Sequence, residues 1–137
     1  MSPLEGDERR GGRRLIGARP DAVFSQAVRV GNVIHVSGQV AIDENREIVG
    51  VGDSEAQGRQ CFANLARVLD EAGSGLRDVV KLTVFLVGAE HYPGYSKAKR
   101  EAVADVLPAG TAVIVAALMD PRFLMEVEAV AVVPDEI

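Results

Sequence analysis

Val28-Arg29-Val30-Gly31-Asn32-Val33-Ile34-His35-Val36 carries the clearest structural pattern in the chain. Two runs rich in β-branched residues flank Gly31-Asn32, a pair suited to the positive φ angles of a tight turn. The stretch therefore predicts a β-hairpin. Before it, Arg13–Ile16 predicts a short strand, and after it Gln39–Ile42 continues in extended form.

Two helices are expected further along the chain. The first begins at Ser54-Glu55-Ala56-Gln57, which is typical of a capping box in which Ser54 and Gln57 bond the backbone of the first turn. It ends at Gly73, which can adopt the left-handed conformation. The second runs from near Pro93 to Val106. Apolar residues recur at helical spacing in both helices: Cys61, Phe62, Leu65, Val68, Leu69 and Ala72, then Tyr95, Ala98, Ala102 and Val106.

Three further strands are expected at Val79–Val87, Thr111–Ala117 and Leu124–Val133. The order of strands, helix, strand, helix and two strands predicts an α+β domain, in which a mixed sheet carries both helices on one face. Because the strands are rich in Val and Ala, the other face is apolar, so we expect self-association.

A chain of 137 residues fits one domain, which we place at residues 13–137 after a flexible arm, rich in Gly and charge, at residues 1–12. The net charge of −5 and the 4% aromatic content argue against a nucleic-acid binder. No apolar run has the length of a membrane span, so a cytoplasmic protein is expected. Cys61 is interpreted as a packed core thiol rather than a nucleophile, and the scattered His35 and His91 provide no metal-ligand spacing.

Five blocks follow one another along the chain: Phe24–Asn32, Val36–Gln39, Gln60–Gly73, Asp78–Phe85 and Met125–Ala131. In this order they resemble the signatures of the reactive intermediate deaminase family (RidA/YjgF). The resemblance implies a chorismate mutase-like α+β fold that assembles as a barrel-like homotrimer with clefts between subunits. It also implies that these clefts bind a small 2-imino acid, to which water adds without a cofactor.

The resemblance assigns site residues position by position. The glutamate that orients the attacking water falls on Glu126, the catalytic position. A tyrosine that closes the pocket falls on Phe24, an asparagine on Ser96, and a cysteine beside the site on Ala112. The arginine that grips the carboxylate falls on Gly110, so only the glutamate is unchanged.

The glycine at position 110 bears on substrate binding. A charge-assisted bidentate contact contributes about 1.5–3 kcal/mol, or about tenfold to a hundredfold in affinity. Arg122 is the first candidate for a compensating cation. Arg14, Arg19 and Arg29 are further candidates, although we expect all four to be ordinary surface arginines.

Two other features have both a functional and a structural interpretation. In Ser37-Gly38-Gln39, Gly38 can bring the backbone close to a ligand while Ser37 lines the pocket, or the block only bends the strand. Glu126 and Glu128 point to one face of an apolar strand, where unpaired carboxylates are costly. One of them faces a cleft, or both form an acidic stripe or pair with Lys81.

Two functional hypotheses follow. The first is an enzyme that hydrolyses reactive imines or enamines such as 2-iminopropanoate and 2-iminobutanoate, or a non-standard substrate that does not need the arginine. The alternative is a non-catalytic, small-molecule-binding or regulatory trimer with the same fold. Ribonuclease activity is disfavoured because no histidine pair is available for acid–base chemistry.

Overall fold

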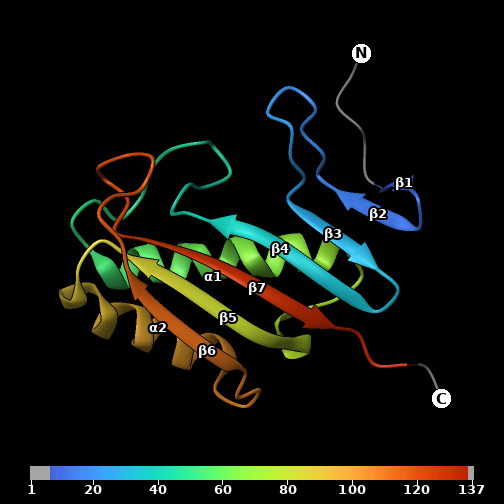
Figure 1. Cartoon of the computed structure of the whole chain (residues 1–137). Coiled ribbons are helices and arrows are strands. Elements are labelled where there is room, and N and C mark those ends of the chain that lie inside the picture. Colours follow the sequence, from blue (N-terminus) through green and yellow to red (C-terminus); the bar gives the residue numbers. More distant parts are fainter. Residues whose placement is uncertain (1–6, 136–137) are drawn as a thin grey trace.

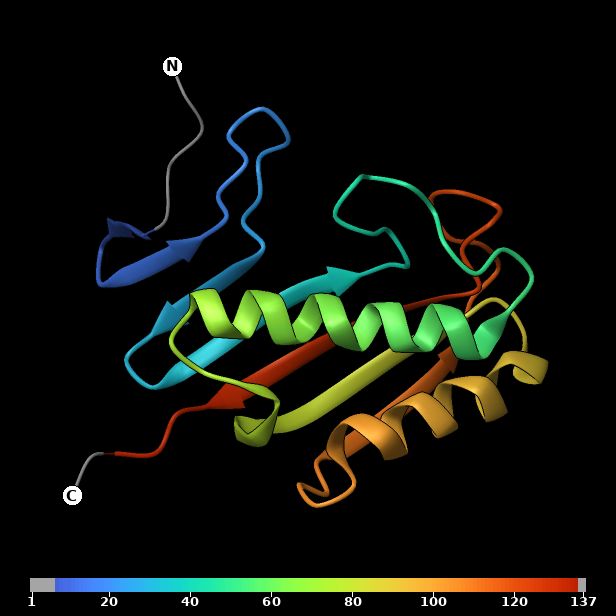
Figure 2. The same cartoon turned by 180° about the vertical axis from the view of Figure 1, so that it is seen from behind.

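A seven-stranded mixed sheet carries two helices on one face (Figures 1 and 2), which confirms the predicted α+β architecture. The computed structural model describes residues 7–135. The strands are β1 (Asp7–Arg10), β2 (Arg13–Ile16), β3 (Ala27–Val30), β4 (Val33–Gln39), β5 (Val79–Leu86), β6 (Ala109–Ile114) and β7 (Met125–Val132), and the helices are α1 (Ser54–Glu71) and α2 (Tyr92–Val103). Their order in the sheet is β1-β2-β3-β4-β7-β5-β6.

The hairpin predicted around Gly31-Asn32 is confirmed. Val30 pairs with Val33, and Gly31 has a φ of 58°, a value that glycine adopts without steric cost. The sequence did not predict β1, which pairs with β2 across Gly11-Gly12. Of the arm expected at residues 1–12, residues 1–6 lie outside the described part of the chain.

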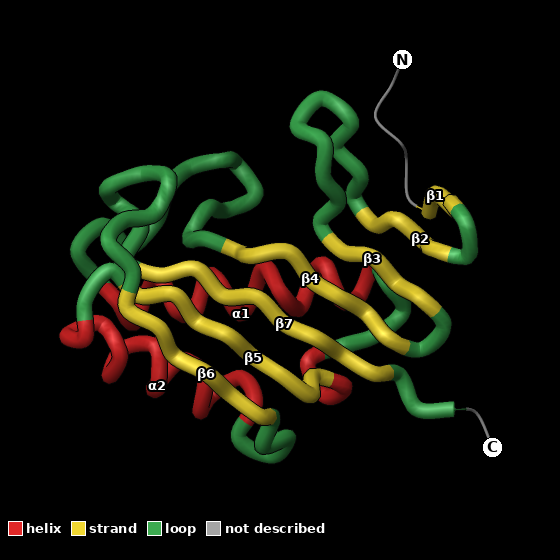
Figure 3. Tube along the Cα trace, viewed as in Figure 1, coloured by secondary structure: helices red, strands yellow, loops and turns green. Residues whose placement is uncertain are grey.

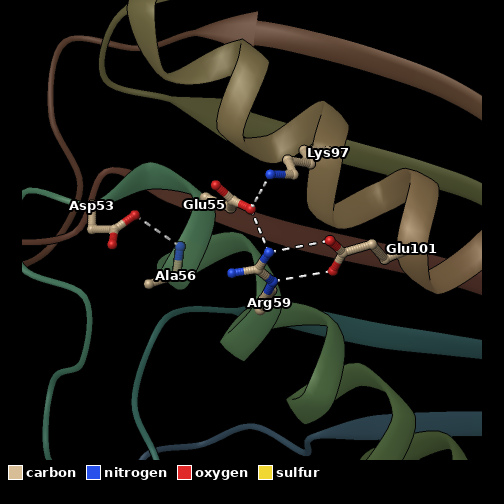
Figure 4. A network of polar contacts seen from close by, with 6 residues as sticks. All are labelled: Asp53, Glu55, Ala56, Arg59, Lys97 and Glu101. Atoms are coloured by element: carbon tan, nitrogen blue, oxygen red, sulfur yellow. Dashed lines mark hydrogen bonds and ion pairs between the residues drawn. The ribbon is translucent and has the colours of Figure 1, made fainter.

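The capping box predicted for α1 is wrong, because the helix is capped one residue earlier. The Asp53 carboxylate accepts a hydrogen bond from the Ala56 N–H at 3.1 Å (Figure 4). The Ser54 hydroxyl instead contacts His91 Nδ1 at 2.6 Å, which links the start of α1 to the start of α2. The end of the helix is as predicted, since Gly73 follows it with a φ of 83°.

Gln57 is buried and connects α1 to the segment before β7. Its side-chain N–H donates to the carbonyl of Arg122 at 2.9 Å, and its side-chain oxygen accepts from the N–H of Leu124 at 2.8 Å. The Gln57 side chain therefore provides hydrogen-bond partners for two backbone groups that lie outside the β-sheet.

Gln57→Ala should lower the free energy of unfolding by about 2 kcal/mol or more, because it leaves the Arg122 carbonyl and the Leu124 N–H without partners. Chemical denaturation of the purified protein measures this loss. Gln60→Ala is the matched control on the same helix, since the Gln60 amide donates only to Asn64. Equal losses in the two variants would contradict this role of Gln57.

The unit β5-α2-β6 is the parallel part of the sheet, and its helix packs beside α1. The helix α2 ends at Val103, three residues earlier than predicted, and β6 begins at Ala109 rather than Thr111.

Ion pairs join the two helices on their outer surface. Arg59 donates to Glu101 at 3.1 Å and also pairs with Glu55 (Figure 4). Lys97 pairs with Glu55 at 2.9 Å.

The core lies between the helices and one sheet face. Cys61 is fully buried there, and burial raises the pKa of its thiol to about 12, in agreement with a packed structural cysteine. In the described part of the chain no helix covers the opposite face, and Val113 and Val132 are exposed on it. Among residues 7–135, no helix has the length and apolar character needed to cross a membrane.

Candidate functional site

Glu126 lies on the open face of β7, between β4 and β5, because its neighbours Met125 and Val127 point into the core. The side chain is half-buried. Burial raises the pKa of its carboxyl above the ordinary value, and the charge of Glu128 on the same face raises it further. Such a carboxylate holds a proton more tightly than an exposed glutamate, which suits proton transfer.

Glu128 and Lys81 test one interpretation of the acidic pair, in which the carboxylates pair with Lys81. Glu128 is exposed, whereas Lys81 donates a hydrogen bond to Thr111 Oγ1 on β6 at 2.6 Å. Within the described residues, Lys81 forms no ion pair with Glu126 or Glu128. The half-buried Glu126 therefore lacks the cross-sheet partner that a purely structural carboxylate would need.

A β-bulge in β4 places Gly38 directly against Glu126. From Val36 to Gln39, β4 advances by three residues while the paired β7 advances by two. A Cβ atom at position 38 would lie 2.7 Å from Glu126 Cδ and 2.8 Å from Oε2. Only glycine therefore leaves room for the carboxylate in its present position.

Ser37 and Gln39 form hydrogen bonds with the β2–β3 loop, which contains Phe24. The Ser37 hydroxyl donates to the carbonyl of Ser25 at 2.6 Å, and the Gln39 amide donates to Gln26 Oε1 at 3.0 Å. Phe24 is 44% exposed at the end of this loop. Ser37 is thus placed to position Phe24.

A cavity of about 610 Å³ opens between the β2–β3 loop and the β4–α1 loop, which project to the same side of the sheet (Figure 3). Phe24 and Gly38 both line it, so these two predicted residues come together, with Glu126 against Gly38. Arg19 and Arg67 also line the cavity. Arg19 pairs with Asp21 at 3.5 Å, and Arg67 donates to Asn64 at 3.0 Å.

Ser96 and Gly110 form a second group at the other edge of the sheet. Ser96 lines a cavity of about 370 Å³ along α2, together with Lys99 and Arg100. Gly110 lies beside this group, since a Cβ at position 110 would be 3.2 Å from Lys99 Nζ. The sequence signal for Lys99 was its helical spacing of three residues from Ser96, which places both on one face of α2.

One chain does not bring the two groups together. Gly110 pairs with Leu82 of β5, whereas Glu126 pairs with Phe85 three residues further along the same strand. Leu82 is buried under the helices and Phe85 lies on the open face. Gly110 and Glu126 are therefore separated both along the strands and across the sheet.

The arginines named as candidate substitutes for position 110 mostly have structural contacts. Arg122 forms a two-bonded ion pair with Asp120 at 2.9 and 3.0 Å, which lowers the pKa of Asp120 to about 2. Arg122 lines neither of the two cavities. Arg14 donates to the carbonyl of Glu71, and Arg29 donates to that of Ala72, both at the end of α1.

Residues 7–135 contain no group of three or more His, Cys, Asp or Glu side chains that could hold a metal ion.

Comparison with known proteins places this arrangement in a family. The family model described as Endoribonuclease L-PSP matches residues 16–133. The 3-aminoacrylate deaminase RutC of Acinetobacter baylyi is 34% identical over 112 residues, which cover 82% of this chain and 88% of that protein. The 2-iminobutanoate/2-iminopropanoate deaminase of Dermatophagoides farinae is 28% identical over 118 residues, covering 86% and 91%.

A solved structure agrees with these relatives. The crystal structure of RidA from the Antarctic bacterium Psychrobacter sp. PAMC 21119 has a TM-score of 0.74 and 34% sequence identity, and it covers 80% of this chain and 88% of that chain. The matched region includes every element from β3 to β7. The chain therefore belongs to the Endoribonuclease L-PSP family, the RidA/YjgF family that its sequence blocks resemble.

Proposed function

We propose that this protein is a cofactor-independent deaminase that hydrolyses small imines or enamines of the 2-iminopropanoate and 2-iminobutanoate type. The observation that carries the proposal is Glu126, a half-buried carboxylate with a raised pKa. It lies on β7, whose other residues apart from Glu128 are apolar, and against the glycine in the β4 bulge. The names of the two deaminase relatives support this class of chemistry.

The chemistry requires one proton acceptor and one water molecule. The ionised carboxylate of Glu126 accepts a proton from water as the water oxygen bonds to the carbon of the C=N group. The proton passes to the nitrogen, and a tetrahedral aminoalcohol results. The hydroxyl proton of this intermediate then passes to the nitrogen, by way of the Glu126 carboxylate. The C–N bond breaks as the C=O bond forms, so that a 2-imino acid and water give a 2-oxo acid and ammonia.

The proposal includes a homotrimer with substrate clefts between subunits. Two observations support it: Glu126 and Gly110 lie on opposite faces of the sheet in one chain, and the open sheet face carries exposed apolar residues. A neighbouring copy that places its β6 edge beside Glu126 would complete the site. Light scattering in solution should therefore give three times the chain mass of 14.6 kDa.

The activity can be tested with 2-iminopropanoate made in place by an amino-acid oxidase acting on alanine. Semicarbazide traps the free imine, so the protein should lower the yield of the trapped product in proportion to its concentration. 2-Iminobutanoate and 3-aminoacrylate, tested in the same way, establish the preferred substrate. An unchanged yield with all three compounds would contradict the proposal.

A non-catalytic binding protein is the second candidate, and the observation that favours it is Gly110, which has no side chain to hold a carboxylate. This candidate predicts that the neutral analogue pyruvamide binds at least as tightly as pyruvate, the 2-oxo product, and that imine hydrolysis is not accelerated. Calorimetric titration with both compounds, combined with the trapping assay, separates the two candidates.

A further inference from the structure

The cavity along α2 is lined by two cations without partners. Its lining residues are Tyr92, Ser96, Lys99, Arg100, Val103 and Leu107, with Ala104 and Pro108. Within residues 7–135, neither the Lys99 nor the Arg100 side chain forms a hydrogen bond or an ion pair, and no carboxylate lines the cavity. The lining therefore carries two positive charges and no negative one, which suits an anion.

The ammonium group of Lys99 lies close to the place where the Cβ of a side chain at position 110 would be. The ammonium nitrogen lies 3.2 Å from the position of a Cβ on Gly110, and β6 is exposed along its whole length. The backbone of Gly110 does not have a positive φ, so conformation does not require glycine here. The missing side chain instead gives the Lys99 ammonium access to the edge of β6.

The other cavity is a poorer anion site. Two of its three lining arginines already have contacts, since Arg19 pairs with Asp21 and Arg67 donates to Asn64, and the third is Arg46. Asp43 and Glu44 also line it, so its positive charge is partly offset. In the α2 cavity, by contrast, unpaired lysine and arginine side chains coincide with a lining free of acids.

We propose that the Lys99–Arg100 cavity binds the carboxylate of the substrate, with Lys99 as the principal contact and Ser96 as a hydrogen-bonding neighbour. This assignment rests on the proposed function for the identity of the substrate. Lysine binds a carboxylate as a point charge with rotatable donors, whereas arginine binds it through a planar fork. The substrate class is therefore a small 2-imino or enamino monocarboxylate, held by charge rather than by a fixed planar geometry.

The test compares Lys99→Met, which removes the charge and keeps most of the volume, with Lys97→Met as the matched control. Lys97 is two residues away on the same helix but pairs with Glu55 and does not line the cavity. Pyruvate, the anionic product, and pyruvamide, its neutral analogue, serve as calorimetric probes. Lys99→Met should weaken pyruvate binding about tenfold or more and leave pyruvamide binding unchanged, and Lys97→Met should change neither.

A second-site variant makes the test sharper. Gly110→Arg in the Lys99→Met background should recover most of the lost pyruvate affinity, because it returns a cation to the same place. In the wild-type background, Gly110→Arg brings a second cation against Lys99 and should give a smaller gain than in the Lys99→Met background.

Failure of this assignment differs from failure of the proposed function. If the protein hydrolyses 2-iminopropanoate while Lys99→Met leaves both KM and pyruvate affinity within twofold of wild type, the Lys99 assignment is wrong. If Lys99→Met weakens pyruvate binding but the wild-type protein hydrolyses no imine, the Lys99 assignment is supported and the deaminase proposal is wrong. Absence of pyruvate binding to the wild-type protein would overturn the assignment directly.

Discussion

Glu126→Gln should lower kcat/KM for imine hydrolysis by about 100-fold or more, because a positioned acid–base group contributes about 10²–10⁴-fold. The amide has nearly the shape of the carboxylate but cannot accept a proton from water. The half-buried setting and raised pKa make Glu126 the group on the open face best suited to this step. The trapping assay at pH 8, run on both proteins under the same conditions, measures the loss.

Glu128→Gln is the matched control, since Glu128 lies two residues away on the same face but is exposed. It should retain wild-type kcat/KM at pH 8. Stability gives a second control. A carboxyl whose folded pKa lies above its unfolded value loses stability as pH rises through that interval, so Glu126→Gln should unfold at the wild-type temperature or higher at neutral pH. Equal activity of Glu126→Gln and wild type would contradict the proposed role.

Gly38→Ala should lower kcat/KM by about tenfold to a hundredfold with little loss of stability. Its new Cβ would lie 2.7 Å from Glu126 Cδ, so the carboxylate must move. The side chain is flexible enough to do so at small cost to the fold, but a misplacement of about 1 Å in a catalytic group can cost about 100-fold in rate. Steady-state kinetics and a thermal melt of the same preparation measure the two effects.

Gly31→Ala, on the same hairpin, should have the opposite effect: a loss of stability with activity retained. A Cβ at position 31 meets no atom within 4 Å, but the φ of 58° is strained for alanine. This variant should lose about 1 kcal/mol of stability and keep its activity. If Gly38→Ala lost stability and kept full activity instead, the close approach to Glu126 would not matter for function.

The sheet and helices could be predicted because their signals are local. The turn at Gly31, the apolar spacing of α1 and the stop at Gly73 each depend on a few neighbouring residues. The cap of α1 could not be decided in this way, since Asp53 and Ser54 are both good caps. The contact of Ser54 with His91, 37 residues away, accompanies the choice of Asp53.

The candidate site was predicted only in part. The resemblance pointed to Glu126, but the bulge that makes Gly38 its neighbour arises from the pairing of β4 with β7, which the sequence does not display. In the same way, Lys99 meets Gly110 only because α2 packs over the β6 edge. Arg122 was preferred from its position in the chain, and the nearby Asp120 carboxylate holds it instead.

The most direct measurement is the pH dependence of kcat/KM for 2-iminopropanoate hydrolysis in the wild type and in Glu128→Gln. If ionised Glu126 accepts the proton, activity falls as pH falls through its pKa, which burial and Glu128 place above the ordinary glutamate value of 4.5. Removing the charge of Glu128 should move this acid limb to lower pH, while the titration of the substrate is the same for both proteins. An acid limb at the same pH in both proteins, or no acid limb, would contradict the account.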